Sequence, residues 1–334
     1  MAETVDKPLN KKPLVSCIII FLNAKKENFF EEAIESILAQ TYDNWELILA
    51  DDGSTDESTA IAQDYAEQYS DKIRYVEHDG HENRGMSTTR NLGIRHAKGG
   101  YVAFLDADDV WLPYKLEQQV ALIEAHPEAA MLYGRTKYWF SWAEDNPCIQ
   151  TFRPDAVTND FLTITSKKFD TLIAPPTQLL SFLENRDVYP CTCSILIRRW
   201  VFEEIGMFEE SFRNAHEDMV FHAKLFLKVP VYVSSQCWDL YRMHPDSYWR
   251  AADREGKGAE VRYIGHFNYL LWLENYLSEQ GIKDFKVWKA LRKALWPYRH
   301  PRLNRQLSRI QHPIRSMRNL LKKVEKKYLV VSSG

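Results

Sequence analysis

The chain has 334 residues, of which 45% are apolar, and it carries a net charge of −3. This composition excludes an intrinsically disordered protein, and the length suits one α/β domain with an appended segment. The five cysteines are odd in number and widely spaced, which argues against a disulfide-stabilised secreted scaffold and favours reduced thiols in the cytoplasm. Residues 1–12 are polar and predict a disordered leader rather than a signal peptide, and the longest apolar run, 14–22, is too short to span a bilayer.

The first hundred residues alternate between strand and helix patterns. Apolar runs bounded by turn residues predict strands at 14–22, 45–50, 73–76 and 101–105. Capping residues and apolar residues at helical spacing predict helices at 29–38, 55–69 and 86–96. This alternation is typical of a parallel sheet whose strands are joined by right-handed helical crossovers.

Two of these predicted strands end in acidic residues. Asp51 and Asp52 follow the second strand, and Asp106, Asp108 and Asp109 follow the fourth. Open α/β sheets bind ligands outside the carboxyl ends of their strands, so these acids are expected at one ligand-binding edge. Asp106 and Asp108 offer two hard oxygen ligands that suit Mg²⁺ or Mn²⁺ carrying a phosphate. An isolated pair would more simply form a solvated turn, with Asp109 capping the next helix, but the recurrence on two strands favours a site.

The pattern becomes less regular after the first half of the domain. Further strands are predicted at 129–133, 191–197 and 231–233, and further helices from 113, at 198–205, from 217 and at 260–277. Residues 139–190 form a variable region that is rich in aromatic, polar and proline residues and begins without clean periodicity. A long irregular segment of this kind indicates either a lid or an acceptor-binding insertion.

Four sequence blocks, in this order, resemble the nucleotide-sugar domain of family 2 glycosyltransferases. They are VSCIIIFLN from residue 15, ELILADDGSTD from 46, ENRGMSTTRNLGI from 82 and YVAFLDADD from 101. The resemblance covers about residues 13–250 and places a catalytic domain at 13–255. It implies the A-type glycosyltransferase fold, an α/β fold with a Rossmann-like, mostly parallel sheet flanked by helices. It also implies transfer of a sugar from a nucleoside diphosphate donor, usually with inversion at the anomeric carbon.

The resemblance assigns the donor side of the site. Asp51 would bind the nucleobase or ribose and Asp52 would support it, with the alternative that both only shape a turn. Arg84 and Arg90 are candidates to hold the diphosphate, because a guanidinium binds phosphate with two hydrogen bonds. Arg90 is preferred, since Arg90-Asn91 matches an Arg-Asn pair of the family. A UDP-sugar is the expected donor, although Phe21-Leu22 departs from the small polar pair that the family has beside the base.

The resemblance also assigns the metal and the catalytic base. Asp108 would bind Mn²⁺ or Mg²⁺ directly, and Asp106 would reach the ribose or the metal through water. Glu217-Asp218 matches an acidic pair of the family, which makes Asp218 the expected base and Glu217 the residue that orients the acceptor. The segment Tyr241-Arg242-Met243-His244 is similar to another family motif, in which His244 would contact the metal or the diphosphate. A lone histidine is otherwise more often structural.

The C-terminal region, residues 256–334, is predicted to be a helical basic extension. Fourteen Lys and Arg residues and a single Glu lie within 286–327, so the rest of the chain is acidic. Two helices separated near Pro313 each carry an apolar stripe opposite their basic residues. This pattern fits peripheral binding to an anionic membrane, at the inner face of the cell membrane, near a glycan or lipid-linked acceptor. Packing against the catalytic domain, or across a homodimer, explains the same pattern.

Two other classes of function were weighed against a transferase. A dinucleotide-binding oxidoreductase shares the alternating pattern, but no G-x-G-x-x-G follows the first predicted strand. A catalytically silent nucleotide-sugar-binding or scaffold protein is opposed by the joint presence of Asp106, Asp108 and Asp218. No nucleic-acid partner is expected, because aromatic stacking motifs on a sheet face are not apparent.

Overall fold

A computed structural model describes residues 12–25, 27–143, 160–163, 168–213 and 215–304 of the chain. Most of the predicted leader, the middle of the variable region and the basic segment beyond residue 304 lie outside the described residues. The chain divides into two compact units, Met1–Tyr269 and Leu270–Gly334, so the division falls within helix α10, Gly258–Glu279.

The first unit is built on one mixed sheet with the strand order β3-β2-β1-β4-β9-β6-β10-β5. Its strands are β1 Val15–Phe21, β2 Trp45–Asp51, β3 Ile73–Glu77, β4 Tyr101–Asp106, β5 Val110–Trp111, β6 Met131–Trp139, β7 Phe161–Leu162, β8 Thr171–Ile173, β9 Ile195–Arg198 and β10 Val231–Arg242. The four strands β3, β2, β1 and β4 are parallel, and so are β6 and β10. The predicted α/β fold with a mostly parallel core is therefore confirmed, while β5, β7, β8 and β9 pair antiparallel.

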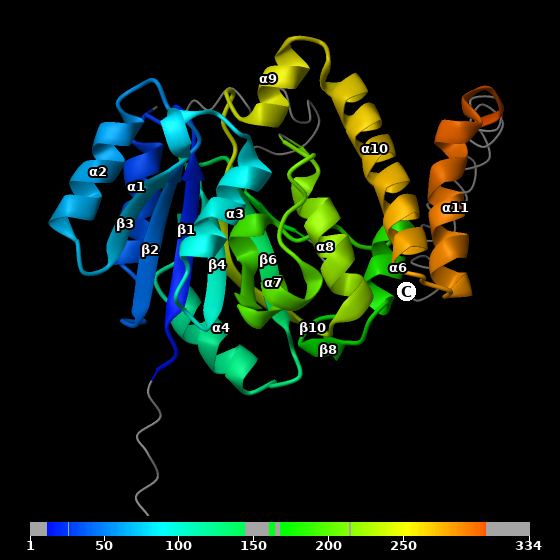
Figure 1. Ribbon diagram of the computed structural model, residues 1–334, viewed down its shortest axis with the longest axis horizontal. Helices are drawn as coiled ribbons and strands as arrows, with labels where there is room; N and C mark the ends of the chain where they lie inside the picture. The colour runs from blue at the N-terminus through cyan, green and yellow to red at the C-terminus, as the bar shows by residue number, and fades with distance from the viewer. Residues whose placement is uncertain (1–11, 26, 144–159, 164–167, 214, 305–334) are drawn as a thin grey trace, which may run out of the picture. The chain divides into compact units, whose positions relative to one another are not determined.

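Helices cover both faces of this sheet (Figure 1). They are α1 Phe29–Leu38, α2 Ser58–Gln68, α3 Met86–His96, α4 Lys115–Glu124, α6 Thr177–Leu183, α7 Trp200–Ile205, α8 Glu217–Lys228 and α9 Tyr248–Arg254, with short 3₁₀ turns at Asp79–His81 and Thr192–Ser194. Figure 1 shows α3, α7 and α8 in front of the sheet. On β1, Cys17 and Ile19 belong to the core that α1 and α4 complete, whereas Ile18 on the opposite face contacts α3.

Three predicted strands differ from the structure. The strand predicted at 129–133 is β6, which starts at Met131 and runs on to Trp139. The strand predicted at 191–197 begins as the 3₁₀ turn Thr192–Ser194, and only β9 continues it, antiparallel between β4 and β6. The strand predicted at 231–233 is the start of β10, which runs on to Arg242. Register shifts against β6 after Val233 and after Cys237 interrupt the alternation of side chains, which hides this extension in the sequence.

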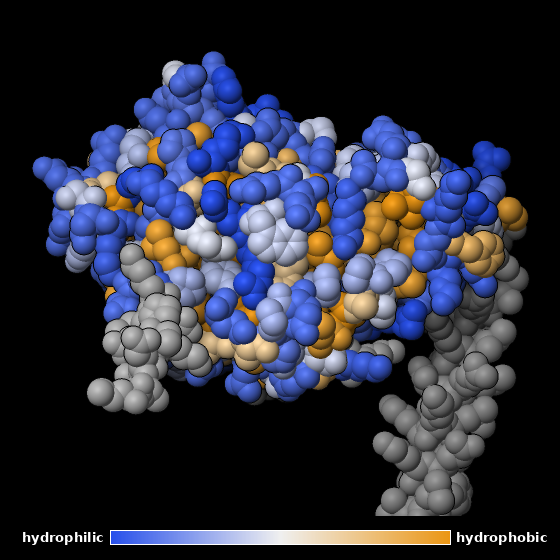
Figure 2. Space-filling view, turned by 60° about the horizontal axis from the view of Figure 1, so that its bottom comes forward, coloured by the Kyte–Doolittle hydropathy of each residue, from blue (hydrophilic) through white to orange (hydrophobic). Residues whose placement is uncertain are grey.

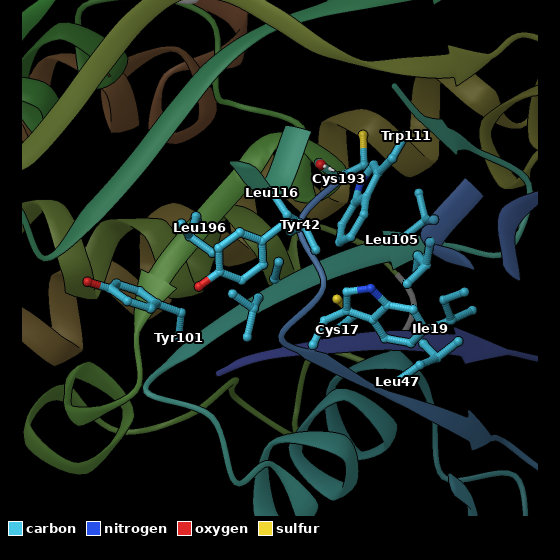
Figure 3. Packing of buried hydrophobic residues seen from close by; sticks show 14 of the residues in the cluster. Cys17, Ile19, Tyr42, Leu47, Tyr101, Leu105, Trp111, Leu116, Cys193 and Leu196 are labelled. Atoms are coloured by element: carbon cyan, nitrogen blue, oxygen red, sulfur yellow. Dashed lines mark hydrogen bonds between the residues drawn. The ribbon is translucent and has the colours of Figure 1, made fainter. Parts of the chain in front are cut away.

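The core beside β1 is closed by the strand that follows the acidic turn of β4. Trp111 in β5 is 1% exposed, and its indole N–H donates to the carbonyl of Cys193 at 2.9 Å. Figure 3 shows the two residues side by side above the apolar side chains of β1 and β4. Buried Lys115 lies with its ammonium group 4.9 Å from the Trp111 ring centre and donates to Gln119. The position of the acidic turn is thus tied to the core through Trp111.

The second unit contains the end of α10 and helix α11, Phe285–Arg299. The Asp284 carboxylate accepts hydrogen bonds from the backbone N–H groups of Lys286 and Val287, which caps α11 at its first turn. Val287, Leu291 and Leu295 are buried at helical spacing. Because this stripe is covered within the structure, α11 is a packed helix with basic residues on its outer side.

The described surface is ordinary for a polar globular chain. Figure 2 shows a face on which hydrophilic residues predominate and hydrophobic residues appear in small groups between them. Exposed large apolar side chains are scattered along the sequence, for example Leu22, Val188 and Phe285. Among the described residues, none of the helices combines the length and the apolar character that a membrane span needs.

The close approach of α3 to β1 yields a first prediction. A Cβ on Gly93 would lie 2.5 Å from Cγ2 of the buried Ile18, so Gly93→Ala should push the helix off the sheet. We expect a lower melting temperature, since overpacking costs about 1–3 kcal/mol and the better helix propensity of Ala returns only about 1 kcal/mol of that. Thermal unfolding followed by circular dichroism measures this. Gly100→Ala, where no atom lies within 4 Å of the added Cβ, is the matched control and should unfold like the wild type.

Candidate active site

The acids predicted from the sequence gather at the carboxyl end of β1. Asp51 in β2 pairs with Phe21, and Asp106 in β4 pairs with Ile20, so the two carboxylates flank the last residues of β1. The strand order changes direction here, because β2 and β3 lie on one side of β1 and β4 on the other. Such a switch point opens a crevice in which α/β proteins bind their ligands.

The carboxylate of Asp51 is hydrogen-bonded to groups that follow it in the chain. The side chain is 0% exposed. One carboxylate oxygen accepts from the backbone N–H of Ser54 at 2.8 Å, and the other accepts from the hydroxyls of Thr59 at 2.6 Å and Tyr75 at 3.2 Å. These contacts fix the turn after β2 and tie it to α2 and β3. The predicted contact of Asp51 with a nucleobase or ribose stays a prediction.

Asp52 organises the loop that leads into α3. Its Oδ1 accepts from the backbone N–H groups of Arg84 at 2.8 Å and Gly85 at 3.0 Å, and from the hydroxyl of Thr89 at 2.8 Å. The Arg84 guanidinium is exposed and pairs with exposed Glu82 at 3.2 Å. An exposed pair of this kind contributes little stability. The predicted contact of Arg84 with the diphosphate stays a prediction.

Arg90 is a buried connector between two acids. The side chain is 1% exposed, and its guanidinium donates to Asp106 at 3.0 Å and to Glu217 at 2.5 Å. Burial alone lowers the pKa of Arg90, but the charges of Glu217 and Asp106 outweigh it and raise that pKa above its usual range. The predicted contact of Arg90 with the diphosphate stays a prediction, while the observed contacts join the end of β4 to the start of α8.

Asp218 lies in the first turn of α8, directly after Glu217. One of its oxygens accepts from the backbone N–H of Met219 at 2.7 Å. Burial, followed by the negative charge of Glu217, raises the pKa of Asp218 to about 7. A carboxylate with such a pKa is suited to accept a proton near neutral pH. The geometry therefore brings the predicted base to the same site as Asp106, through Glu217 and Arg90.

Asp108 and His244 meet on the other side of Asp106. His244 Nε2 lies 2.9 Å from Asp108 Oδ2, and the Asp108 side chain is 38% exposed. Burial raises the pKa of Asp106; Arg90 opposes this rise and Asp108 adds to it. Asp109 does not cap the following helix, because it is 0% exposed and accepts from the backbone N–H of Arg242 at 2.9 Å.

The residues present fit a divalent cation that shares its coordination with a substrate. Among the described residues, no group of three or more His, Cys, Asp and Glu side chains is arranged to hold a metal by itself. Asp108 and His244 nevertheless converge. A carboxylate is a preferred ligand of Mn²⁺ and Mg²⁺, and a neutral imidazole is a common metal ligand in proteins. Mg²⁺ and Mn²⁺ at phosphate-transfer sites commonly use few protein ligands and complete their shell with phosphate oxygens and water.

The sequence patterns did not single out Arg242 or Glu32. Arg242 lies two residues before His244, within the segment that resembles a family motif. Its place in that segment is a signal that could have indicated a role at the site. Its side chain is buried against the acidic turn and pairs with Glu32 from α1. Glu32 has the sequence pattern of an ordinary acid in the first turn of a helix. Nothing in its local sequence indicates that it pairs with Arg242.

Comparison with known proteins agrees with this fold. The model of the glycosyl transferase family 2 matches residues 16–206. The uncharacterized glycosyltransferase RT0329 of Rickettsia typhi is 32% identical over 277 residues, which is 82% of this chain and 77% of that protein. The putative glycosyltransferase EpsE of Bacillus subtilis is 44% identical over 118 residues, or 35% of this chain. The matches to EpsE and to an uncharacterized glycosyltransferase of Rickettsia felis span only 41% and 37% of those proteins.

A solved structure shares the architecture at low sequence identity. The structure of residues 1–349 of S. aureus TarS in complex with UDP-GlcNAc has a TM-score of 0.51 and 21% identity, and it covers 69% of this chain and 58% of that one. This likeness concerns the fold. Since the family model matches more than half of the residues, the chain belongs to the glycosyl transferase family 2 and has its A-type fold.

Proposed function

We propose that the protein is an inverting, metal-dependent glycosyltransferase that moves a sugar from a nucleoside diphosphate donor, most simply a UDP-sugar, to a glycan or lipid-linked acceptor. Family membership supports the transfer reaction. A relative in Bacillus subtilis that is 37% identical over 153 residues is named as a putative teichuronic acid biosynthesis glycosyltransferase, TuaG. TarS has been crystallised with UDP and with UDP-GlcNAc. These names support a role in polysaccharide, lipopolysaccharide or glycoconjugate synthesis.

The observation that carries the proposal is the bridge from Asp106 through Arg90 to Glu217. It joins Asp106, at the end of β4, to the acidic pair that opens α8, although 127 residues separate Arg90 from Glu217 in the sequence. Inversion needs a base on the face of the anomeric carbon opposite the leaving group. Acids that come from two different elements, β4 and α8, support such a division of roles.

Asp218 acts as the base in this mechanism. Its second carboxylate oxygen takes the proton of the acceptor hydroxyl as that oxygen attacks the anomeric carbon. Because burial and Glu217 raise the pKa of Asp218 to about 7, the deprotonated group is basic enough to assist at neutral pH. Glu217, held on one oxygen by Arg90, orients the acceptor with its other oxygen.

The leaving group departs on the opposite side. Asp108 and His244 would hold Mn²⁺ or Mg²⁺, with Asp106 beside them, and the bound metal would neutralise the charge that develops on the nucleoside diphosphate. Arg84, on the loop before α3, adds a second cation for the diphosphate once it leaves Glu82. Asp51 and Asp52 keep the base and ribose side of the crevice in shape.

The basic segment beyond residue 304 lies outside the described residues, so its role rests on the sequence. We assign it to an anionic membrane surface at the inner face of the cell membrane, where a cytoplasmic transferase meets lipid-linked acceptors.

The first prediction of the proposal concerns the base. Asp218→Asn removes the proton acceptor but keeps the shape of the side chain, so kcat should fall by about 100-fold to 10,000-fold while donor binding persists. Release of UDP from UDP-sugars measures kcat, and titration calorimetry measures donor affinity. Asp64→Asn, an exposed acid on α2, is the control and should retain full activity. Retained turnover in the Asp218 variant would assign the base to another residue.

The second prediction concerns pH. Below about pH 7 Asp218 holds its proton and cannot accept another, so kcat/KM of the wild type should fall about tenfold per pH unit there and level off above it. The residual activity of Asp218→Asn should lack this inflection. Stopped assays across the neutral range, in buffers of constant ionic strength, test the profile. A wild-type rate that stays level through pH 6 would contradict the proposed role.

The third prediction concerns nucleotide and metal. UDP together with Mn²⁺ should raise the melting temperature more than either alone, because the metal and the diphosphate would complete each other's binding site. A ligand at 100 times its Kd stabilises by about 2.7 kcal/mol. Asp108→Asn should lose the share that depends on Mn²⁺. Scanning fluorimetry with UDP, GDP and CDP identifies the base in the same experiment. Equal stabilisation by UDP with Mn²⁺ or with EDTA would remove the metal from the proposal.

A further inference from the structure

Arg242, at the last position of β10, is buried in an aromatic cage beside the acidic turn. The side chain is 2% exposed. Its guanidinium carbon lies 4.2 Å from the ring centre of Phe29, 4.7 Å from that of Trp139 and 5.4 Å from that of Trp142. Three rings around one guanidinium favour the cation through their quadrupoles and exclude water from it. A buried cation surrounded by three rings is unusual for a residue that only fills space, because an apolar side chain would fill the same volume without the cost of burying a charge.

The polar contacts of Arg242 are directed at the turn that carries the candidate metal ligand. Its Nε donates to the backbone carbonyl of Asp108 at 2.8 Å, and its Nη2 pairs with Glu32 in α1. Its backbone N–H donates to the Asp109 carboxylate at 2.9 Å. One residue thus joins the start of α1, the turn after β4 and the end of β10.

The same cage also holds the segment that carries His244. The Phe29 ring meets the His244 ring edge to face at 5.2 Å, so Phe29 contacts both Arg242 and His244. Trp142 donates its indole N–H to the carbonyl of Met243 at 3.0 Å and packs against Phe29 at 5.0 Å. The His244 ring and the backbone just before it are therefore held by groups that also surround Arg242.

We propose that Arg242 is a positioning residue that fixes Asp108 and His244 against each other, so that the pair can take a divalent cation together with the donor diphosphate. The inference rests on the proposed function. Only a planar guanidinium can stack between rings while its fork donates to a carbonyl and a carboxylate at once. A lysine ammonium keeps the charge but is a compact donor that cannot keep both contacts and the stacking.

The test uses the full chain, Mn²⁺ and UDP. Electron paramagnetic resonance counts free and bound Mn²⁺ in the wild type and in Arg242→Lys, with and without UDP. We expect Arg242→Lys to raise the Kd for Mn²⁺ in the presence of UDP by about tenfold, the effect typical of groups that orient metal ligands. Binding of UDP in EDTA should stay as in the wild type. A loss confined to the metal is not expected of a residue that only stabilises the fold.

Arg198→Lys is the matched control. Arg198 also donates to backbone carbonyls, those of Ala129 and Ile123, and lies over the ring of Tyr101, but at the opposite end of β4 from the acidic turn. Its Mn²⁺ affinity should equal that of the wild type. Arg198 is partly buried, with 18% of its side chain exposed, so an equal loss in both variants would show a general effect of replacing a packed arginine and would overturn the inference.

A second variant covers the case in which Arg242→Lys does not fold. Glu32 is half exposed, so Glu32→Gln leaves the core intact and removes only the charge that holds Nη2. We expect a smaller rise in the Kd for Mn²⁺, about threefold. If Arg242→Lys folds and its Mn²⁺ affinity is unchanged, the inference about Arg242 is wrong, while the proposed function stands. If Arg242→Lys does not fold, unchanged Mn²⁺ affinity in Glu32→Gln has the same meaning. Absence of Mn²⁺ binding in the wild type with UDP would instead overturn the proposed metal site, and this inference with it.

Discussion

The arrangement of the site depends on one buried guanidinium. Arg90 comes from α3, and its two partners come from the end of β4 and the start of α8. A buried ion pair or triad often adds little net stability, yet removing one member leaves an unpaired charge and costs about 3–5 kcal/mol. The three elements therefore have one low-energy arrangement at this edge of the sheet. This constraint orients the acidic pair of α8 toward the end of β4.

The same charge sets the electrostatics around it. Asp106 and Asp218 both have raised pKa values, mainly because they are buried, and further because other acids lie nearby. The charge of Arg90 opposes this rise in pKa at both carboxyls. Burial, and then the charge of Arg90, lower the pKa of His222 to about 3, so this buried ring beneath the site stays neutral. Burial and the charge of Glu217 bring the pKa of Asp218 to about 7, within the neutral range.

The sequence predicted the parts of the fold that local patterns determine. The apolar runs of β1, β2 and β4, and the acids at the ends of β2 and β4, were located closely, since a buried parallel strand is a continuous apolar segment. The length of β10 was missed because bulges against β6 break its alternation. The partners of Arg90 could not be predicted from the sequence either. The pair Arg90-Asn91 matches a family motif but does not indicate which acids contact the arginine. Glu217 comes next to Arg90 only when α8 packs in the folded chain.

Arg90 and Arg242 act on the two ends of the same acidic turn. Arg90 holds the Asp106 side chain from α3, and Arg242 holds the Asp108 carbonyl from β10. Because both ends are fixed, the turn has little conformational freedom before a ligand binds. It therefore loses little conformational entropy on binding, which lowers the free-energy cost of binding. Dipoles and charges that are fixed in advance also stabilise a developing negative charge better than groups that must reorganise. The exposed side chains near this edge keep their freedom to move, Arg84 among them, because the described structure pairs it with an exposed acid, Glu82, and such a pair restrains a side chain only weakly.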